Sequence, residues 1–433
     1  MKKSVLLKIF ASLLASLMIF LSSCGVDLGI STTAADGTGT PTQVIPGQDD
    51  TGAKSGAYNG MFDGIMTVNL TLGDAELSTI LDHADSEMYC ECGITVGKES
   101  LQNVGIKPRG NTKFVTNSGS TKYSFKLKFN KYTKGQKLNG LDEMYLNNTS
   151  YDPSYVREYL AYALFSLHYG TAAPLAAFAK VYINGEYYGL YLAVEGIDES
   201  FLKREFGDDN GNLYKADKGS SFLSDDTSTF TLERGVDNNL SKISAIYNAL
   251  YDMESLPDVL DVESVLRYAA VIAVVCGQES YLGAKAENYY LYEDKDGTTY
   301  IIPWDMKTVL GIDLTLVKSE YSIDTSLITA SVTEPYFELD GSDRPLVYKL
   351  LEVEKYKKEY LSYVKYYADA LSDLLPKLCE IKEAIDEAVS ADEKRFFDKE
   401  TYEAEFADGE NTLYGFIKSR CENIASQLSA LGE

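Results

Sequence analysis

The sequence is poor in the residues that many hydrolytic sites and disulfide frameworks require. It has two histidines, His83 and His168, and neither lies in a recognisable motif, so a Ser-His-acid site has no obvious base. Its six cysteines are irregularly spaced, and five remain if Cys24 is modified as argued below. An odd, irregular set is no disulfide framework. These absences argue against a serine hydrolase and against a disulfide scaffold.

Basic residues are scarce as well. The chain has 40 lysines and arginines against 65 aspartates and glutamates, and its formal net charge is −25. Such an acidic chain is a poor partner for nucleic acid and for anionic lipid headgroups. It would also repel a free nucleotide polyphosphate unless a cation or a local basic patch intervenes. We therefore expect no nucleic-acid partner, and contact with a membrane only through a lipid anchor.

Two short stretches superficially suggest a metal. Cys90 and Cys92 are separated by one residue, with His83 upstream, but the spacing matches no familiar zinc site. We interpret the two cysteines as alternate positions on one face of a strand. Residues 207–212 (GDDNGN) lack the alternating ligand spacing of a calcium loop and are interpreted as a turn.

The N-terminal residues have the features of an export signal. Lys2 and Lys3 precede a short apolar stretch, which is too short for a spanning helix, and small residues lead to Cys24. Residues 21–24 (LSSC) resemble the bacterial lipobox, which implies cleavage after residue 23 and lipid on the Cys24 sulfur. Several acyl chains there would anchor the protein stably. An ordinary signal peptide is the alternative; lipidation predicts an extracytoplasmic protein, lipid-anchored to the bacterial cell membrane.

Residues 24–60 are rich in Gly, Thr, Ser, Ala and Asp and lack apolar periodicity. They are interpreted as a flexible tether. Residues 61–433 are enough for one large two-lobed unit or two domains. Strand and turn signals dominate up to about residue 195, and helical signals dominate from about residue 196. This order predicts an α+β fold with a strand-rich N-terminal lobe and a helix-rich C-terminal lobe.

Local patterns define several elements. Residues 121–130 alternate, with the aromatic and apolar side chains of residues 123, 125, 127 and 129 on one face and lysines on the other, which predicts a strand. A helix is predicted to start with Asp152 as its N-cap and Pro153 at its first position. Asn184-Gly185 between two apolar runs predicts a hairpin.

A second hairpin is predicted to turn at residues 294–297. Its second strand carries the only tryptophan, Trp304, and leads directly into Asp305, with Lys307 two residues later. An unpaired buried carboxylate is costly, so Asp305 needs a partner. The sequence leaves open whether that partner is a metal ion with a phosphate or a neighbouring loop.

Taken in order, these motifs resemble the CotH family, the spore coat protein H-like atypical protein kinases. The resemblance extends from about residue 61 to the C-terminus, and each motif alone is weak whereas their order is specific. The matching segments are 103–114 (NVGIKPRGNTKF), 122–129 (KYSFKLKF), 152–165 (DPSYVREYLAYALF), 182–198 (YINGEYYGLYLAVEGID), 211–217 (GNLYKAD), 288–305 (NYYLYEDKDGTTYIIPWD) and 344–361 (RPLVYKLLEVEKYKKEYL).

The resemblance implies a two-lobed, kinase-like fold that binds ATP with Mg²⁺ or Mn²⁺ between its lobes. It implies transfer of the γ-phosphoryl group to Ser or Thr of a surface or coat protein, a reaction that depends mainly on positioning and charge neutralisation. Asp305 corresponds to the family aspartate after tryptophan, the expected metal ligand. Asn288 is expected to complete the metal site or orient the phosphate, and Glu279 occupies a catalytic acid position.

Further roles follow from the same resemblance. Lys122 and Lys126 are candidates for phosphate contacts, although a solvated lysine face is the alternative. Arg109, in an Arg-Gly-Asn turn, would contact phosphate or fix that turn. Glu195, with Gly196, is expected where the lobes join, near the adenine. Arg157 is assigned to the nucleotide site, with an ion pair between lobes as the alternative.

Two positions depart from the family pattern. Glu279 replaces an aspartate, and a carboxylate displaced by about 1 Å can lose about a hundredfold in rate. Lys307 replaces the second acid of a Trp-Asp-x-Asp motif. It could contact a phosphate in place of a cation, or pair with Asp305 and leave the metal site idle. The alternative function is therefore a catalytically degenerate surface module that binds nucleotide, protein or polysaccharide.

Overall fold

The computed structural model describes residues 56–167, 171–235, 240–312, 322–337 and 339–432. The chain divides into two units, Met1–Pro41 and Thr42–Glu433, and all described residues belong to the second unit. The predicted signal segment, Cys24 and His168 lie outside the described residues. Both strands and helices are present, which confirms the α+β prediction.

Seven strands of the described chain close into a barrel, in the order β1-β2-β3-β4-β5-β7-β6. They are β1 (Met66–Thr71), β2 (Cys90–Val96), β3 (Glu99–Arg109), β4 (Ser124–Lys128), β5 (Glu143–Asn147), β6 (Ala176–Ile183) and β7 (Glu186–Glu195). Neighbours run antiparallel except β1 and β6, which are parallel with Val68 opposite Val181. The sequence predicts strands here but not their closure into a barrel.

The barrel interior follows from the alternation of residues along each strand. Tyr123, Phe125, Leu127 and Phe129 are all buried, so the predicted apolar face of this segment is confirmed. Cys90 and Cys92 occupy alternate buried positions on β2, with exposed Glu91 between them, and form no disulfide. Among the described residues, no group of three or more His, Cys, Asp or Glu side chains is arranged to hold a metal ion on its own.

Both predicted hairpins are confirmed. β6 and β7 are joined at Asn184 and Gly185, whose φ angles of 51° and 86° fit the tight turn that matches strand twist. The second hairpin joins β10 to β11, and its turn is closed by hydrogen bonds between the backbone groups of Asp294 and both Gly297 and Thr298.

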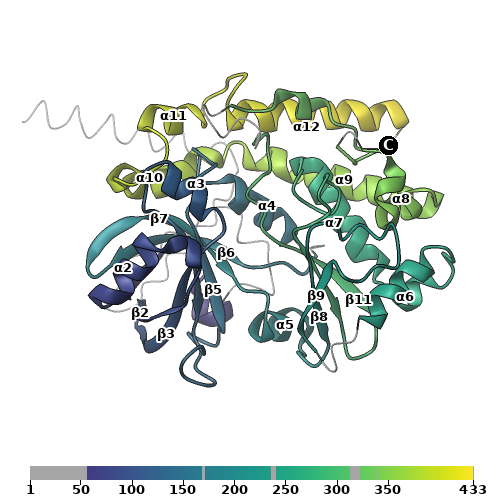
Figure 1. Ribbon diagram of the computed structural model, residues 1–433. Helices are drawn as coiled ribbons and strands as arrows, with labels where there is room; N and C mark the ends of the chain where they lie inside the picture. Colours follow the sequence, from purple (N-terminus) through teal and green to yellow (C-terminus); the bar gives the residue numbers. More distant parts are fainter. Residues whose placement is uncertain (1–55, 168–170, 236–239, 313–321, 338, 433) are drawn as a thin grey trace, which may run out of the picture. The chain divides into compact units, whose positions relative to one another are not determined.

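A second, four-stranded antiparallel sheet has the order β11-β10-β8-β9. Its strands are β8 (Asn212–Ala216), β9 (Phe230–Arg234), β10 (Tyr289–Glu293) and β11 (Thr299–Pro303). The sequence predicts a largely helical lobe from about residue 196 onward. This part of the chain also contains a complete four-stranded sheet. Figure 1 shows the barrel strands in blue and the second sheet in teal to green.

The helices are α2 (Asp74–Asp82), α3 (Thr112–Asn117), α4 (Arg157–Phe165), α5 (Glu199–Phe206), α6 (Ser241–Ala249), α7 (Val262–Val275), α8 (Pro345–Leu351), α9 (Glu354–Leu374), α10 (Leu378–Ala391), α11 (Lys399–Ala404) and α12 (Leu413–Leu431). The long helices α9 and α12 pack side by side, and α9 also packs on α7 (Figure 1). No helix in the described part of the chain is sufficiently long and hydrophobic to span a membrane.

Helix α4 begins later than predicted. The Asp152 carboxylate accepts hydrogen bonds from the backbone N–H groups of Ser154 (2.9 Å) and Arg157 (2.8 Å), so it holds a turn in front of the helix. Tyr155 has a φ of 66°, which a right-handed helix does not allow. The prediction of Asp152 as N-cap and Pro153 as first helical residue is therefore wrong, and α4 starts at Arg157.

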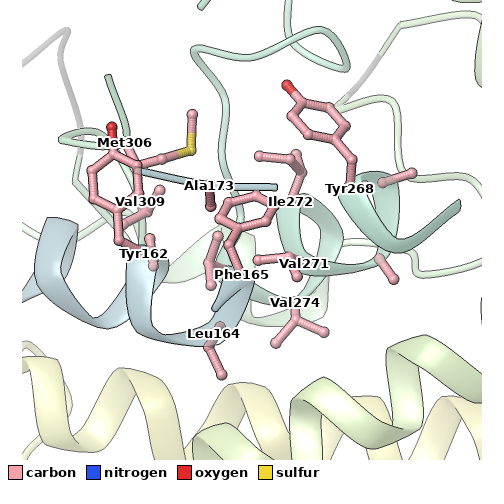
Figure 2. Close-up of a cluster of buried hydrophobic side chains, with 14 of the residues drawn as sticks. Tyr162, Leu164, Phe165, Ala173, Tyr268, Val271, Ile272, Val274, Met306 and Val309 are labelled. Carbon is pink, nitrogen blue, oxygen red and sulfur yellow. The ribbon is translucent and has the colours of Figure 1, made fainter. Parts of the chain in front are cut away.

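Helix α4 packs against α7 through the apolar cluster drawn in Figure 2, in which the rings of Phe165 and Tyr268 stack with centroids 5.9 Å apart. The segment after β11 joins this cluster through Met306 and Val309, both buried. Burial alternates along this segment, so Asp305 and Lys307 remain partly exposed between buried neighbours. The core thus fixes the backbone that carries both charged side chains.

Candidate functional site

A cavity of about 510 Å³ lies between barrel strands β3 to β5 and the second sheet. Its lining includes Trp304 and Tyr290 from the second sheet and its exit, and Tyr145 from the barrel. The lining also carries lysines and arginines from both sides. These are Lys107, Arg109, Lys126, Lys128, Lys215 and Arg234. The lining carries acids as well, and several of them are paired with these cations, so a polyanion would bind by exchanging places with a carboxylate. These acids are Glu87, Asp142, Glu143, Asp198, Glu199 and Glu233.

A second, smaller cavity of about 30 Å³ adjoins the first, and Arg109 and Gly110 line both. Its lining includes Asp305 and Lys307 from the segment after β11 and Glu158 from helix α4. The loop from β5 to α4 completes it with polar side chains. The volume is close to that of one water molecule, so this cavity suits a single small ion or a phosphate oxygen rather than a whole ligand.

Asp305 is held at the end of β11 in a left-handed conformation, with a φ of 54°. Its backbone N–H donates to the hydroxyl of Tyr162 on α4, 3.1 Å away. Its carboxylate lies 3.0 Å from Nζ of Lys307 and 3.8 Å from a guanidinium nitrogen of Arg109. Burial acts to raise the pKa of Asp305, but the two cations outweigh it and the pKa is lowered. Asp305 is therefore an anion at neutral pH.

Arg109 connects the two cavities. Its guanidinium stacks over the rings of Tyr145 and Trp304, 4.8 Å and 5.8 Å from their centroids. Its Nη1 donates to Oδ1 of Asn147 at 3.1 Å, while Nη2 faces Asp305. Planar stacking and several fixed donors are properties that lysine could not supply here. The predicted alternatives for Arg109 were a phosphate contact or a turn; its position on both cavities is consistent with either.

Glu158 is a site residue that the sequence analysis missed. Both of its carboxylate oxygens accept from Nδ2 of Asn147 at 3.0 Å, and it is buried beside Asp305. Burial, followed by the negative charge of Asp305, raises the pKa of Glu158 to about 7. One signal was available: Glu158 is an acid inside an otherwise apolar helix pattern, four residues before Tyr162, and so on the same helix face.

Glu279 and Asn288 lie next to Asp305 in the fold, but neither is part of the described lining of the two cavities. Glu279 pairs with Lys285 at 2.5 Å and accepts from Oγ1 of Thr308 at 3.3 Å. The side-chain amide of Asn288 donates to the backbone carbonyl of Glu279 at 3.1 Å. The backbone carbonyl of Asn288 accepts from the backbone N–H of Trp304. Asn288 thus ties the Glu279 loop to the strand that presents Asp305.

Of the two predicted phosphate-binding lysines, only Lys126 lines the large cavity. Its Nζ is 2.9 Å from Glu143 and 5.0 Å from the centre of the Tyr145 ring. Lys122 is fully buried elsewhere, paired with Asp392 at 2.5 Å. The prediction for Lys122 does not agree with the structure, because β4 begins only at Ser124 and strand alternation does not extend back to Lys122.

Glu195 and Arg157 are not in the lining of either cavity, although Arg157 is paired with Asp152, which lines the small one. Glu195 is buried and accepts from Nε of Arg204 (2.9 Å), the hydroxyl of Tyr58 (2.5 Å) and the N–H of Leu175 (2.9 Å). These contacts leave it holding the barrel to α5 rather than facing an adenine. Arg157 forms buried ion pairs, which was the alternative to its assignment to the nucleotide site.

The guanidinium of Arg157 is fully buried between Asp152 (2.6 Å) and Glu405 (2.8 Å), and its Nε donates to the carbonyl of Leu310. The pairs connect the start of α4 to the end of α11 and to the loop that follows Asp305. Gly196, next to Glu195, lies closer to the site, because a Cβ there would come within 2.3 Å of Cγ of Glu143, which lines the large cavity.

The donor set beside the small cavity fits a divalent cation that shares its ligands with a phosphate. Asp305 and Glu158 offer carboxylate oxygens and Asn147 an amide oxygen, and Mg²⁺ typically takes one or two carboxylates and completes its coordination with water and phosphate oxygens. The adjoining large cavity provides room for the remaining phosphates, and its lining includes lysines and arginines among its charged side chains. Two carboxylates beside one ion and cations around a polyphosphate are the parts that phosphoryl transfer uses.

Two comparisons with known proteins bear on the family of this chain. Residues 106–424 match the family described as CotH kinase protein. The chain is similar to the inner spore coat protein H of Bacillus subtilis (strain 168), with 26% identity over 314 residues, which cover 67% of this chain and 80% of that protein. The matched residues run from within β3 to α12 and include Arg109, Glu158, Glu279 and Asp305.

Proposed function

The chain belongs to the CotH kinase family, and from this premise we propose that it is an ATP- and divalent-metal-dependent phosphotransferase with an atypical, two-lobed kinase-like fold. The acceptor is a Ser or Thr hydroxyl of a surface or coat protein. The observation that carries the proposal is the cavity between the barrel and the second sheet, which Arg109 joins to a small cavity lined by Asp305 and Glu158.

Each group has a role in this proposal. Arg109 and Lys126 bind phosphate oxygens from the barrel side, and Tyr145 and Trp304 offer aromatic surface beside them. Asp305, with Glu158 and Asn147, would hold Mg²⁺ or Mn²⁺, which supplies charge neutralisation on the phosphate oxygens when bound. None of these side chains has to be brought from another part of the fold, so the phosphates are oriented by a site that is already assembled.

Glu279 is the proposed acceptor of the hydroxyl proton. Its carboxylate is engaged by Lys285 and by the Thr308 hydroxyl, so it must exchange the Lys285 contact for the substrate hydroxyl. A general base has to reach within hydrogen-bond distance of the proton that it removes. The longer glutamate side chain and this competing ion pair together predict slow turnover relative to family members that have aspartate here.

The proposed location is extracytoplasmic. The Bacillus subtilis relative is named a spore coat protein. The LSSC stretch at residues 21–24 indicates a lipid anchor on Cys24. The partner would then be a protein on the same cell surface or coat. Nucleic acid is not proposed, because the chain carries a net charge of −25.

The test is transfer of labelled γ-phosphate by the full-length chain, purified in detergent, with Mg²⁺ or Mn²⁺ and a cell-surface protein extract. Asp305→Ala should abolish transfer. Asp296→Ala, in the exposed β10–β11 turn, is the matched control and should leave transfer unchanged. Undiminished transfer by Asp305→Ala would refute the assignment.

The same proteins separate the alternative, a degenerate binding module. The contact between Lys307 and Asp305 at 3.0 Å favours it, because the ammonium occupies one side of the expected metal ligand. Stabilisation of the chain by Mg-ATP in a thermal-shift measurement, with no transfer by any preparation, would identify binding without catalysis.

A further inference from the structure

Lys307 occupies the position of an acid in the family pattern. Its side chain lines the small cavity, where it could contact a ligand. Its Nζ is 3.0 Å from Oδ2 of Asp305, and its side chain is 34% exposed. Among the described residues, Asp305 is the acid within ion-pair distance of it. An ammonium has three donors, so two remain for the small cavity that Lys307 lines.

The local charge balance supports a ligand that is an anion. Arg109 and Lys307 bring two positive charges to the small cavity, and Asp305 brings one negative charge. Two further carboxylates line this cavity: Glu158, which accepts from Asn147, and Asp152, which is paired with Arg157 at 2.6 Å. With an acid at position 307 the same cavity would carry an excess of negative charge. Lys307 therefore reverses one charge on this cavity, and its ammonium can meet a phosphate oxygen where an acid would repel it.

The backbone places this ammonium firmly. Met306 and Val309 are buried in the core between α4 and α7 (Figure 2), and the Thr308 hydroxyl donates to Glu279. The residues on both sides of Lys307 are thus fixed, and only its own side chain is free to adjust. The backbone that carries this cation therefore needs no reordering when a ligand binds, and the ordering cost is confined to the lysine side chain.

We propose that Lys307 is a built-in cation of the nucleotide site that contacts a phosphate oxygen, takes the place of one divalent ion, and lets this chain bind nucleoside triphosphate in part without metal. The inference rests on the proposed function, because it assumes that the cavity takes a nucleotide. Protein kinases of the usual kind employ two magnesium ions at this step, so a site with Lys307 needs at most one.

The test is isothermal titration of the full-length chain in detergent with ATP, once in EDTA and once in Mg²⁺. The wild-type chain should bind ATP in EDTA, and Lys307→Met should weaken that binding by on the order of tenfold or more, the worth of a hydrogen bond between charged groups. Lys307→Asp, which restores the family acid, should bind ATP only in Mg²⁺. The matched control is Lys382→Met on α10, whose Nζ also lies 3.0 Å from an aspartate, and it should bind as wild type does.

The outcomes separate the inference from the proposed function. Equal binding in EDTA by wild type and Lys307→Met overturns the inference, as does wild-type binding that requires Mg²⁺, and both leave the nucleotide site in place. No ATP binding in either buffer overturns the proposed function itself. Melting temperatures of the variants, measured without ligand, show whether each is folded.

Discussion

The Nζ atom of Lys122 lies 2.5 Å from Oδ2 of Asp392, and neither side chain is exposed to solvent. Asp392 follows helix α10, and it also accepts from the N–H of Leu190 on barrel strand β7 at 3.2 Å. A side chain at Gly189 would collide with the same carboxylate. This ion pair therefore joins the barrel to the C-terminal helices at a place where no water can replace either partner.

Replacing one member of this pair should be far more damaging than replacing both. Asp392→Ala leaves a buried ammonium without its counter-ion, which costs about 3–5 kcal/mol of unfolding free energy. The double variant Lys122→Met with Asp392→Leu removes both charges, so it should lose less than Asp392→Ala, and its remaining loss comes from the Leu190 N–H that no longer has its acceptor. Urea unfolding of the three proteins measures this, and a loss below about 1 kcal/mol in Asp392→Ala would contradict it.

Glu158 should make stability depend on pH. Its pKa is raised in the folded chain from the ordinary value of 4.5 to about 7, because burial and Asp305 disfavour the carboxylate. The folded state thus binds the proton more tightly than the unfolded state, and stability falls as pH rises from about 4.5 to 7. The loss amounts to at most about 3 kcal/mol.

Glu158→Gln has no charge to lose, so the difference in unfolding free energy between wild type and this variant should shift across that pH interval. Urea unfolding at several pH values, without divalent metal, measures the difference. A difference that does not change between pH 4.5 and 7 would show that Glu158 titrates normally.

Lys126 should contribute to nucleotide binding. Lys126 lines the large cavity, and Lys126→Met should weaken Mg-ATP binding by about tenfold, the loss of one charged contact. Lys180→Met removes a lysine from barrel strand β6 that lines neither described cavity, and it should bind normally. Titration calorimetry compares the two, and equal affinities would place the phosphates elsewhere.

Gly196 should tolerate no side chain. A Cβ at this position would lie 2.3 Å from Cγ of Glu143, whose carboxylate pairs with Lys126. Gly196→Ala should therefore cost about 1–3 kcal/mol in stability and also weaken ATP binding. In the control Gly93→Ala, the new methyl group meets only the mobile end of Gln102. Thermal unfolding that is identical in both variants would count against the argument.

The features that sequence could predict are those that short stretches determine. The Asn184-Gly185 hairpin is confirmed because the turn depends on two residues that accept positive φ. The alternation of residues 123–129 identifies the barrel interior for the same local reason. The predicted start of α4 is wrong although it depends on a short stretch. The Asp152 carboxylate accepts its backbone hydrogen bonds in a turn just as it could at a helix N-terminus.

The site itself depends on pairs of residues that are far apart in the chain. Arg109 meets Asp305, and Glu158 lines the same small cavity as both. Residue type alone does not reveal such meetings. The position of Asp305 after an apolar strand predicts that it has a partner, whereas the role of Arg109 follows only from the family resemblance. Glu158 was not predicted, because its contact with Asn147 depends on how the loop between β5 and α4 folds. Lys122 was misplaced because an alternating pattern does not show where its strand begins.

The parallel contact between β1 and β6 that closes the barrel has a kinetic consequence. Val68 cannot pair with Val181 until all of β2 to β5 has left the ribosome. Contacts so distant in sequence form slowly, because the chain loses conformational entropy on closing the loop before the stabilising contacts can form. During that interval the unpaired margins of β1 and β6 are exposed to other chains, and this protein should benefit from a holding chaperone at its first strand more than at any of its helices.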